Sequence, residues 1–377
     1  MEGIRQIARA AQAWGEQTTV ATLDAPGQAF LEGNPFDCVA LGPGRTGYGY
    51  APRFVPWLQA HARDFDAVVV NGLWQYGSFA TWRALHGGPV PYFVFPHGML
   101  DPYFKHAYPL KHLKKLLYWP WAEYRVLRDA RAVLFTCEDE RLLARQSFGW
   151  YRCNELVVGF GTAPPPVERA AALAAFQVAF PQLADQRIVL FLGRIHEKKG
   201  CDLLVDAFAR LAGQDPRWHL VLAGPCDERL GTQLRARIHD GGITARVTWA
   251  GMLSGDAKWG ALYAAEVFAL TSHQENFGIA VAEALACGTP VLISERVNIW
   301  REIAAAGAGF VAPDTAAGAV DLLARWCALN AAERTAMGAR ARACFDAHFN
   351  MNTVARALSE NIARLVSPSP ASGRGPG

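Results

Sequence analysis

Short apolar runs alternate with longer segments of helical periodicity along most of the chain. Runs of this kind, ending in glycine or a polar residue, are typical of buried strands. In the first half they lie at 18–24, 36–42, 66–72, 91–98 and 132–137, and in the second half at 187–193, 218–224, 246–251, 267–272 and 290–294. Strands separated by helices favour parallel sheets with crossover helices. The pattern therefore predicts an α/β protein with two doubly wound domains.

A proline-rich segment at 160–170 separates the two sets of strands. Its three consecutive prolines, 164–166, cannot enter a helix interior or a central strand, so they favour an extended connection. We place the domain boundary in this segment. The prediction is an N-terminal domain over 1–163 and a C-terminal domain over 164–349.

Both ends of the chain carry distinctive patterns. Residues 350–366 have helical apolar spacing and predict a terminal helix, whereas the low-complexity tail at 367–377 is predicted to be disordered. A doubly wound domain normally opens with a strand, but this chain opens on an amphipathic helical pattern at 1–15. The first strand of the N-terminal domain therefore looks missing.

Composition narrows the class of protein. A chain of 377 residues with 51% hydrophobic and 19% charged residues is that of a folded globular protein of about two domains. The formal net charge of +3 is too small to indicate a nucleic-acid partner. Eight cysteines without a C-x-x-C pair, no signal-peptide pattern and no long uninterrupted apolar stretch together predict a cytoplasmic protein, either soluble or peripheral to a membrane.

Two glutamates mark the segment after the strand at 267–272. Glu275 lies in the loop and Glu283 lies eight positions later on a helix that begins near Gly278. In parallel sheets this loop is where ligands bind, and the helix amides there favour a phosphate. A pair of carboxylates can accept paired hydrogen bonds from the vicinal hydroxyls of a sugar. For either glutamate alone, helix capping by Glu275 or a solvated surface position for Glu283 is the simpler interpretation, but the pair favours a site.

Basic residues follow the first strand of the second half. Arg194 comes directly after that strand, and Lys198 and Lys199 precede a helix that opens at Gly200 or Asp202. Lysines at a helix N-terminus are disfavoured by roughly 0.3 to 1 kcal/mol each, so an anion is their natural complement. Arg194 and Lys199 could clamp a diphosphate, although a solvated basic turn balanced by Asp202 is an alternative. The spacing of a P-loop is absent, which argues against an ATPase.

A histidine ends a strand of the first half. His97 lies between Pro96 and Gly98, in a rigid turn that presents an imidazole at the strand's carboxyl end. A lone histidine is usually structural, and a functional role here depends on the second domain closing over it. Asp101 is a candidate polar neighbour.

Lysines alternate with leucines and aromatic residues over 105–128. Lys111, Lys114 and Lys115 form the basic part of this mixture, which suits an anionic membrane interface. Flanking prolines limit any helix there to about ten residues. The alternative is a core helix that faces inward and has a solvated lysine edge.

Together these residues resemble the GT-B glycosyltransferases, specifically the retaining family 4 (glycosyl transferases group 1), which includes enzymes of bacterial polysaccharide and lipid-linked glycan synthesis. The likeness rests on five motifs: G-R-x(4)-K-G at 193–200, E-x-F-G-x(4)-E at 275–283, A-x-G-x-P-V at 286–291, N-G-L-W at 71–74 and P-H-G-M at 96–99. At the start of the chain, only Gly3 could correspond to the family's glycine-rich loop.

The resemblance implies two Rossmann-like domains facing a central cleft and a hexosyltransferase activity. Such an enzyme moves a sugar from a nucleoside diphosphate sugar to a hydroxyl of a glycan or lipid-linked acceptor, with retention of configuration, in exopolysaccharide or lipid-linked glycan assembly. No metal or other cofactor is expected, and no His/Asp/Glu cluster with metal-ligand spacing occurs. The alternatives are a nucleotide-sugar epimerase of the same fold and a catalytically inactive binding subunit.

The resemblance also assigns roles to single residues. The implied donor-binding set is Arg194, Lys199, Glu275, Asn276, Phe277, Gly278, Ile279 and Glu283. Within it, Arg194 and Lys199 would hold the diphosphate, Glu275 the sugar hydroxyls and Glu283 the ribose. The amides of residues 277–279 would close around the sugar. His97 and Glu275 are the implied catalytic residues, with His97 reaching the donor sugar from the N-terminal domain, and the terminal helix would cross back onto that domain.

Overall fold

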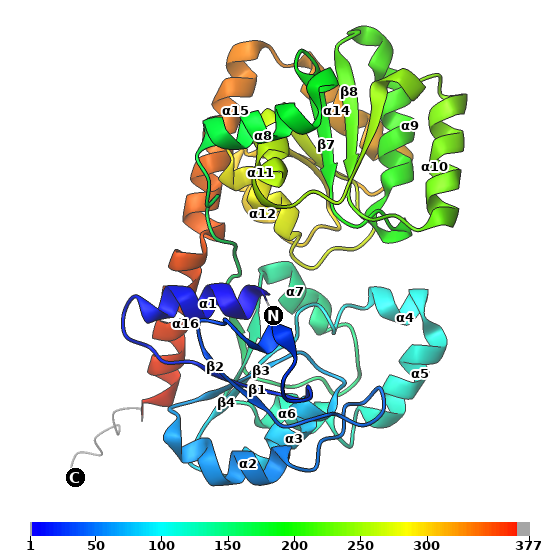
Figure 1. Cartoon of the computed structure of the whole chain (residues 1–377). Coiled ribbons are helices and arrows are strands. Elements are labelled where there is room, and N and C mark those ends of the chain that lie inside the picture. Colours follow the sequence, from blue (N-terminus) through cyan, green and yellow to red (C-terminus); the bar gives the residue numbers. More distant parts are fainter. Residues whose placement is uncertain (1, 368–377) are drawn as a thin grey trace, which may run out of the picture. The chain divides into compact units, whose positions relative to one another are not determined.

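The computed structural model describes residues 2–367 and divides into two compact units (Figure 1). Unit 1 comprises Met1–Phe160 and Val354–Gly377, and unit 2 comprises Gly161–Thr353. Apart from Ser367, the tail predicted to be disordered lies outside the described residues.

Unit 2 is built on a six-stranded parallel sheet with the order β12-β11-β10-β7-β8-β9. Its strands are β7 (Arg187–Leu192), β8 (Trp218–Ala223), β9 (Val247–Gly251), β10 (Val267–Leu270), β11 (Val291–Ser294) and β12 (Gly309–Ala312). The first five confirm the predicted strands. The apolar pattern did not predict β12, because this edge strand begins at a glycine and its two middle residues are only half-buried.

Helices cover both faces of this sheet (Figure 1). They are α8 (Arg169–Ala179), α9 (Cys201–Leu211), α10 (Glu228–Asp240), α11 (Gly255–Ala264), α12 (Ile279–Ala286), α13 (Trp300–Ala306), α14 (Ala316–Ala328) and α15 (Ala331–Cys344). On one face α9 packs against α10 and α14, and on the other α11 packs against α8 and α12. Every residue of β8, β10 and β11 is buried, which explains why these strands are continuous apolar runs.

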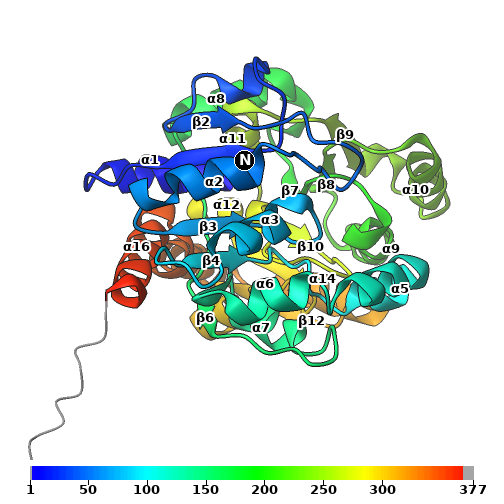
Figure 2. The same ribbon diagram turned by 90° about the horizontal axis from the view of Figure 1, so that it is seen from below.

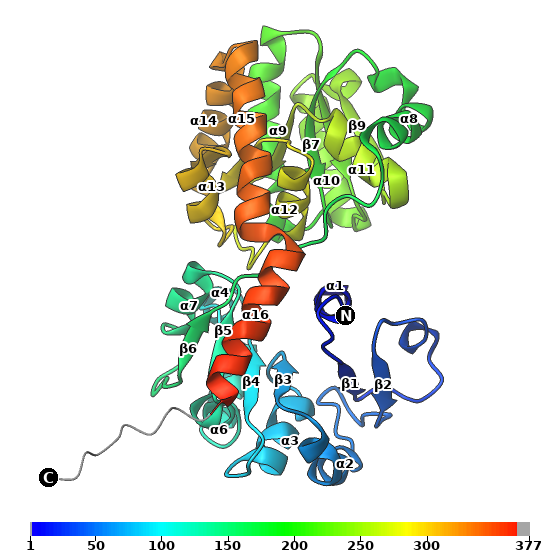
Figure 3. The same cartoon turned by 90° about the vertical axis from the view of Figure 1, so that its left-hand side faces the viewer.

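Unit 1 contains two separate parallel sheets (Figure 3). The larger has the order β3-β4-β5-β6, and the smaller pairs β1 with β2. Their bounds are β1 (Thr19–Thr22), β2 (Asp37–Ala40), β3 (Val68–Asn71), β4 (Tyr92–Phe95), β5 (Ala132–Phe135) and β6 (Glu155–Val157). Within residues 2–367, no strand joins β1 to β3, so the two sheets are separate.

Unit 1 also contains helices, and they pack in more than one core. They are α1 (Glu2–Gln12), α2 (Phe54–His61), α3 (Tyr76–Leu85), α4 (Tyr103–Ala107), α5 (Pro109–Tyr118), α6 (Glu123–Asp129), α7 (Glu138–Ala144) and α16 (Met351–Val366). Helices α2, α3 and α6 form one row (Figure 2). Alternate residues of β4 enter different cores: Tyr92 and Val94 lie with α6, whereas Phe93 and Phe95 pack with Leu358 of α16.

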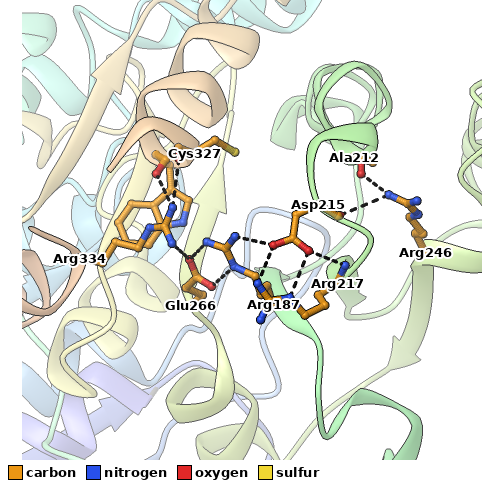
Figure 4. A network of polar contacts seen from close by, with 9 residues as sticks. Arg187, Ala212, Asp215, Arg217, Arg246, Glu266, Cys327 and Arg334 are labelled. Atoms are coloured by element: carbon orange, nitrogen blue, oxygen red, sulfur yellow. Dashed lines mark hydrogen bonds and ion pairs between the residues drawn. The ribbon is translucent and has the colours of Figure 1, made fainter. Parts of the chain in front are cut away.

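An ion-pair network ties the strands of unit 2 together at their amino ends (Figure 4). The first residue of β7, Arg187, donates to both oxygens of Glu266 at 2.8 and 2.7 Å and to Asp215 at 2.9 Å. Its guanidinium also lies 4.0 Å from the ring centre of Trp218. Glu266 precedes β10 and Asp215 precedes β8, so one side chain links three strands at the edge opposite to their carboxyl ends.

We predict that Arg187→Met lowers the free energy of unfolding by about 2 kcal/mol, because it leaves two partly buried carboxylates without their shared donor. Urea unfolding followed by circular dichroism measures this change. The matched control is Arg217→Met, since Arg217 also pairs with Asp215 but its side chain is 64% exposed. Equal urea midpoints for the two variants would contradict a central role for Arg187.

Candidate functional site

Two loops are joined at the carboxyl edge of the unit 2 sheet. The backbone N–H of His273 donates to the carbonyl of Lys198 at 2.8 Å, and the hydroxyl of Thr271 donates to the carbonyl of Gly200 at 2.7 Å, between residues 71 positions apart. Gly200 has a φ of +60°, and a Cβ there would lie 2.1 Å from the Thr271 carbonyl oxygen. Only glycine permits this approach, so the loops after β7 and β10 form one structural unit.

Lys199 and Glu275 form an ion pair across the joined loops. Both side chains are mostly buried, at 23% and 19% exposed. Burial lowers the pKa of Lys199 to about 8, and the nearby charges of Lys198 and Arg194 act in the same direction. Contact with the Glu275 carboxylate favours the charged form, so an ammonium ion predominates at neutral pH. The structure thus brings together Lys199, which the family resemblance assigns to the diphosphate, and Glu275, which it assigns to the sugar hydroxyls.

The second glutamate is also paired with a lysine. Lys258 of α11 donates to Glu283 at 2.6 Å. Glu283 is 8% exposed, and burial raises its pKa while Lys258 opposes that shift. The alternative of a solvated surface position for Glu283 is therefore wrong. Sequence analysis could not identify Lys258, because it belongs to no motif and lies on another helix.

Backbone bonds fix the position of Glu275. Its N–H donates to the Arg296 carbonyl at 2.9 Å, and its own carbonyl accepts from the Asn298 N–H at 3.0 Å. The carboxylate of Asp314 contacts both of the segments that these backbone bonds connect, at His273 (3.0 Å) and at Arg296 (3.3 Å). These partners follow β11 and β12, so the sequence could not relate them to Glu275.

The start of α12 lies directly after this loop. Gly278 is the N-cap with a φ of +77°, and no side chain caps the helix, so the alternative that Glu275 is its cap is wrong. The first amides of a helix, here from Ile279 onward, lack intrahelical acceptors. Phe277 is buried against Phe349, with ring centres 5.7 Å apart.

Arg194 adds an uncompensated positive charge to this edge. Its side chain is exposed and forms no hydrogen bond or ion pair with any described residue. Together with Lys199 and the α12 amides, it makes a position suited to an anion. Among residues 2–367, no three His, Cys, Asp or Glu side chains are grouped as metal ligands.

In unit 1, the predicted histidine is neutral. His97 has a φ of +49°, stacks on Phe95 with ring centres 5.2 Å apart and meets the edge of Phe160 at 5.9 Å. Burial lowers the pKa of His97 to about 4. Its Nε2 lies 3.0 Å from Oδ1 of Asn71. Because that oxygen only accepts, Nε2 carries the proton and Nδ1 remains an acceptor. A Cβ on Gly3 would lie 2.6 Å from the Phe160 ring, so Gly3 packs beside this cluster.

Two buried carboxylates hold the loops around His97. Glu140 of α7 accepts from the Gly98 N–H at 2.5 Å and from the hydroxyl of Thr136 at 2.6 Å. Glu123 of α6 accepts from the Trp74 N–H at 2.7 Å and from Ser78 at 2.9 Å. Sequence analysis missed both, since a glutamate in the first turn of a helix is ordinarily a surface residue. The predicted neighbour Asp101 instead accepts from Tyr103 at 2.8 Å at the start of α4.

Helix α5 has no buried residue, and apart from the half-buried His112, Lys115 and Tyr118 its residues are exposed. Leu110, Leu113 and Leu117 are 78%, 56% and 72% exposed, and Trp121 just beyond is 68% exposed. The alternative of an inward-facing core helix is therefore wrong. No described helix is both long and apolar enough to cross a bilayer, and no disulfide joins the described cysteines.

The fold and this edge define a GT-B protein, with two Rossmann-like units of parallel sheets. Its TM-score is 0.74 to a HepE protein from Anabaena in complex with UDP and glucose, at 18% identity over 96% of each chain. It is 0.75 to the sucrose-phosphate synthase of Thermosynechococcus elongatus, at 24% identity over 96% of this chain and 92% of that one. At these identities the likeness concerns the fold.

Sequence comparison gives the family. Residues 2–161 match the glycosyl transferase 4-like domain and residues 176–343 match glycosyl transferases group 1. The chain belongs to the group 1 glycosyltransferases of GT-B fold. A 125-residue stretch is 36% identical to mannosylfructose-phosphate synthase of Agrobacterium fabrum, covering 32% of this chain and 28% of that protein. The chain spans about a third of the length of the curated relatives that it matches.

We predict that Glu123 makes stability depend on pH. Burial raises the pKa of Glu123 from 4.5 to about 7, and its Oε2 has no hydrogen-bond partner. The folded state therefore binds the proton more tightly, so this contribution to stability is complete below pH 4.5 and is lost as pH rises toward 7. Glu123→Gln should abolish that loss, on the order of 3 kcal/mol.

Urea unfolding of both proteins at several pH values in this window measures the difference. Glu360→Gln, which changes an exposed carboxylate on α16, is the control and should leave the pH profile unchanged. Parallel profiles for wild type and Glu123→Gln would contradict the prediction.

Proposed function

We propose that the protein is a glycosyltransferase that moves a sugar from a nucleoside diphosphate sugar to a hydroxyl acceptor. The observation that carries this proposal is the Lys199–Glu275 pair on two joined loops, beside Arg194 and the start of α12. This edge offers cationic groups for a diphosphate and a carboxylate for sugar hydroxyls at one place. Family membership supports the proposal, as do the UDP and glucose bound to the Anabaena HepE protein.

In the proposed reaction, the bond between the anomeric carbon and the diphosphate oxygen breaks and a bond to the acceptor oxygen forms. Arg194, Lys199 and the α12 amides stabilise the negative charge that develops on the departing diphosphate. The acceptor's proton passes to that diphosphate. Attack on the face that the leaving group departs from would retain the anomeric configuration. These protein groups supply the positive charge, so the proposal requires no metal.

The remaining roles follow from the same assignment. Glu275 accepts hydrogen bonds from the sugar, which requires that ligand binding loosen its pairing with Lys199. Glu283, held by Lys258, accepts from the ribose hydroxyls. We propose His97 as a further sugar contact, and its neutral imidazole offers Nδ1 as an acceptor for a hydroxyl.

We predict that Lys199→Met lowers kcat/KM for transfer by about 100-fold or more, because it removes a charge that stabilises the leaving group. Turnover is measured by mass spectrometry with UDP-, GDP- and ADP-linked sugars and cell-envelope extract as the acceptor source. Lys198→Met is the matched control, since it alters the adjacent lysine and leaves the ion pair intact. Transfer by Lys199→Met within about threefold of wild type would remove this lysine from the site.

The same assay separates the alternatives. A nucleotide-sugar epimerase would change the donor without any acceptor, and an inactive binding subunit would bind donor without forming product. NMR of the anomeric proton in the product reports whether configuration is retained.

We further propose that the acceptor is lipid-linked or belongs to an exopolysaccharide, and that the protein works at an anionic membrane surface through α5. The exposed leucines of α5 and its lysines, Lys111, Lys114 and Lys115, support this proposal. Each lysine near an anionic surface contributes about 1 kcal/mol of attraction.

We predict that replacing these three lysines by glutamate abolishes sedimentation with vesicles that contain phosphatidylglycerol, because attraction becomes repulsion. Vesicles of phosphatidylcholine alone serve as the control and should bind neither protein strongly. Undiminished sedimentation of the triple variant would show that α5 is not the membrane contact.

A further inference from the structure

A small open pocket lies between α4 and α5 of unit 1 and is lined mainly by basic and aromatic residues. Lys105, Lys111 and Lys115 contribute three ammonium groups, and Asp101 is the one carboxylate in the lining. Phe104 and Phe148 form part of its apolar wall. The pocket therefore combines an excess of positive charge with an apolar wall that can contact a hydrocarbon chain.

The pocket lysines form no direct ion pair with any described residue, and the carboxylate nearest in effect is Glu123, whose charge acts on Lys115. Lys115 Nζ lies 4.4 Å from the ring centre of Trp74 and 5.8 Å from that of Phe104, while Lys111 Nζ lies 5.1 Å from that of Tyr108. Neither lysine forms an ion pair in the part of the chain that the structure describes. Aromatic faces hold a partly desolvated cation weakly compared with an anion, so an anionic ligand would complete the pocket.

An exposed apolar stripe runs along α5 beside these lysines. Leu110, Leu113 and Leu117 follow at spacings of three and four residues, which places them on one side of the helix. Lys111 and Lys115 are four residues apart and share the adjoining side, which lines the pocket. A ligand that carries a phosphate on a hydrocarbon chain matches both surfaces at once.

The pocket adjoins the loops that carry His97. Met99, which lines the pocket, accepts a hydrogen bond from the Trp74 indole at 3.2 Å through its carbonyl, and its sulfur accepts from the Leu73 N–H at 3.1 Å. Met99 is two residues beyond His97. A phosphate in the pocket would therefore be next to the carboxyl ends of β3 and β4.

We propose that this pocket binds the phosphate of a lipid-linked acceptor through Lys111 and Lys115, and that the lipid chain lies along the leucine stripe of α5. This inference rests on the proposed function, because it identifies the acceptor of that reaction. It predicts a ligand with a monoester or diester phosphate attached to a long hydrocarbon.

The test uses the full chain and farnesyl phosphate below its micelle concentration, with binding measured by calorimetry. Lys111→Met combined with Lys115→Met should weaken binding by roughly tenfold or more, because both charge-assisted contacts are lost. Lys114→Met is the matched control, since Lys114 is on the same helix but does not line the pocket. It should change the affinity by less than about twofold, because the remaining effect is screened surface charge.

Two further ligands separate the parts of the proposal. Farnesol and inorganic phosphate should each bind at least roughly tenfold more weakly than farnesyl phosphate, because each lacks one of the two contacts. Leu113→Ser combined with Leu117→Ser should weaken the binding of farnesyl phosphate but leave the binding of inorganic phosphate unchanged. Equal binding of farnesol would overturn the phosphate site, and equal binding of inorganic phosphate would overturn the lipid assignment. An effect of Lys114→Met as large as that of the double lysine variant would also overturn the proposal, since it would show diffuse attraction.

A thermal-shift titration with UDP-glucose, GDP-mannose and ADP-glucose distinguishes failure of this inference from failure of the proposed function. Unchanged nucleotide-sugar binding by the double lysine variant shows that unit 2 is intact. A loss of farnesyl phosphate binding by this variant then supports the proposed pocket site. Farnesyl phosphate binding without any nucleotide-sugar binding would reject the glycosyltransferase proposal and retain the lipid-phosphate site. Nucleotide-sugar binding without farnesyl phosphate binding would reject the site alone.

Discussion

The close approach of Gly200 to Thr271 is the contact on which the candidate site depends. It brings the backbone of the loop after β7 against the end of β10, at a separation that no side chain on residue 200 would permit. Because the two loops are joined there, Lys199 and Glu275 can pair although they are far apart in the chain. The charge arrangement of the site is thus a consequence of backbone packing.

The two edges of the unit 2 sheet use charge differently. At the amino ends of the strands, Arg187 is fully engaged with Glu266 and Asp215, and such a closed network stabilises the fold. At the carboxyl ends, Arg194 is exposed and has no described partner, and the Lys199–Glu275 pair beside it is mostly but not fully buried. Unsatisfied charge at the second edge is what makes it suitable for a ligand.

In unit 1, buried carboxylates hold the loops around His97 in place. Glu123 and Glu140 each accept a backbone N–H from a loop that follows a strand, and so fix the conformation of these loops. Their burial costs solvation energy, which these bonds and the hydroxyl donors Ser78 and Thr136 partly offset. The same loops position His97 and border the basic pocket beside α5, so one set of contacts supports both features.

The sequence by itself determined the α/β class, ten of the strands and the residue types of the donor edge, because buried parallel strands and their glycine-rich loops leave a local pattern. It did not predict β6 or β12, which are short and lie at sheet edges, and it left open whether α5 was buried. Only the tertiary structure decided that Lys199 meets Glu275, that Lys258 meets Glu283 and that Glu123 and Glu140 are buried. Those pairings join elements distant in the chain, and a periodic pattern carries information about neighbours along a helix or strand but none about which elements meet.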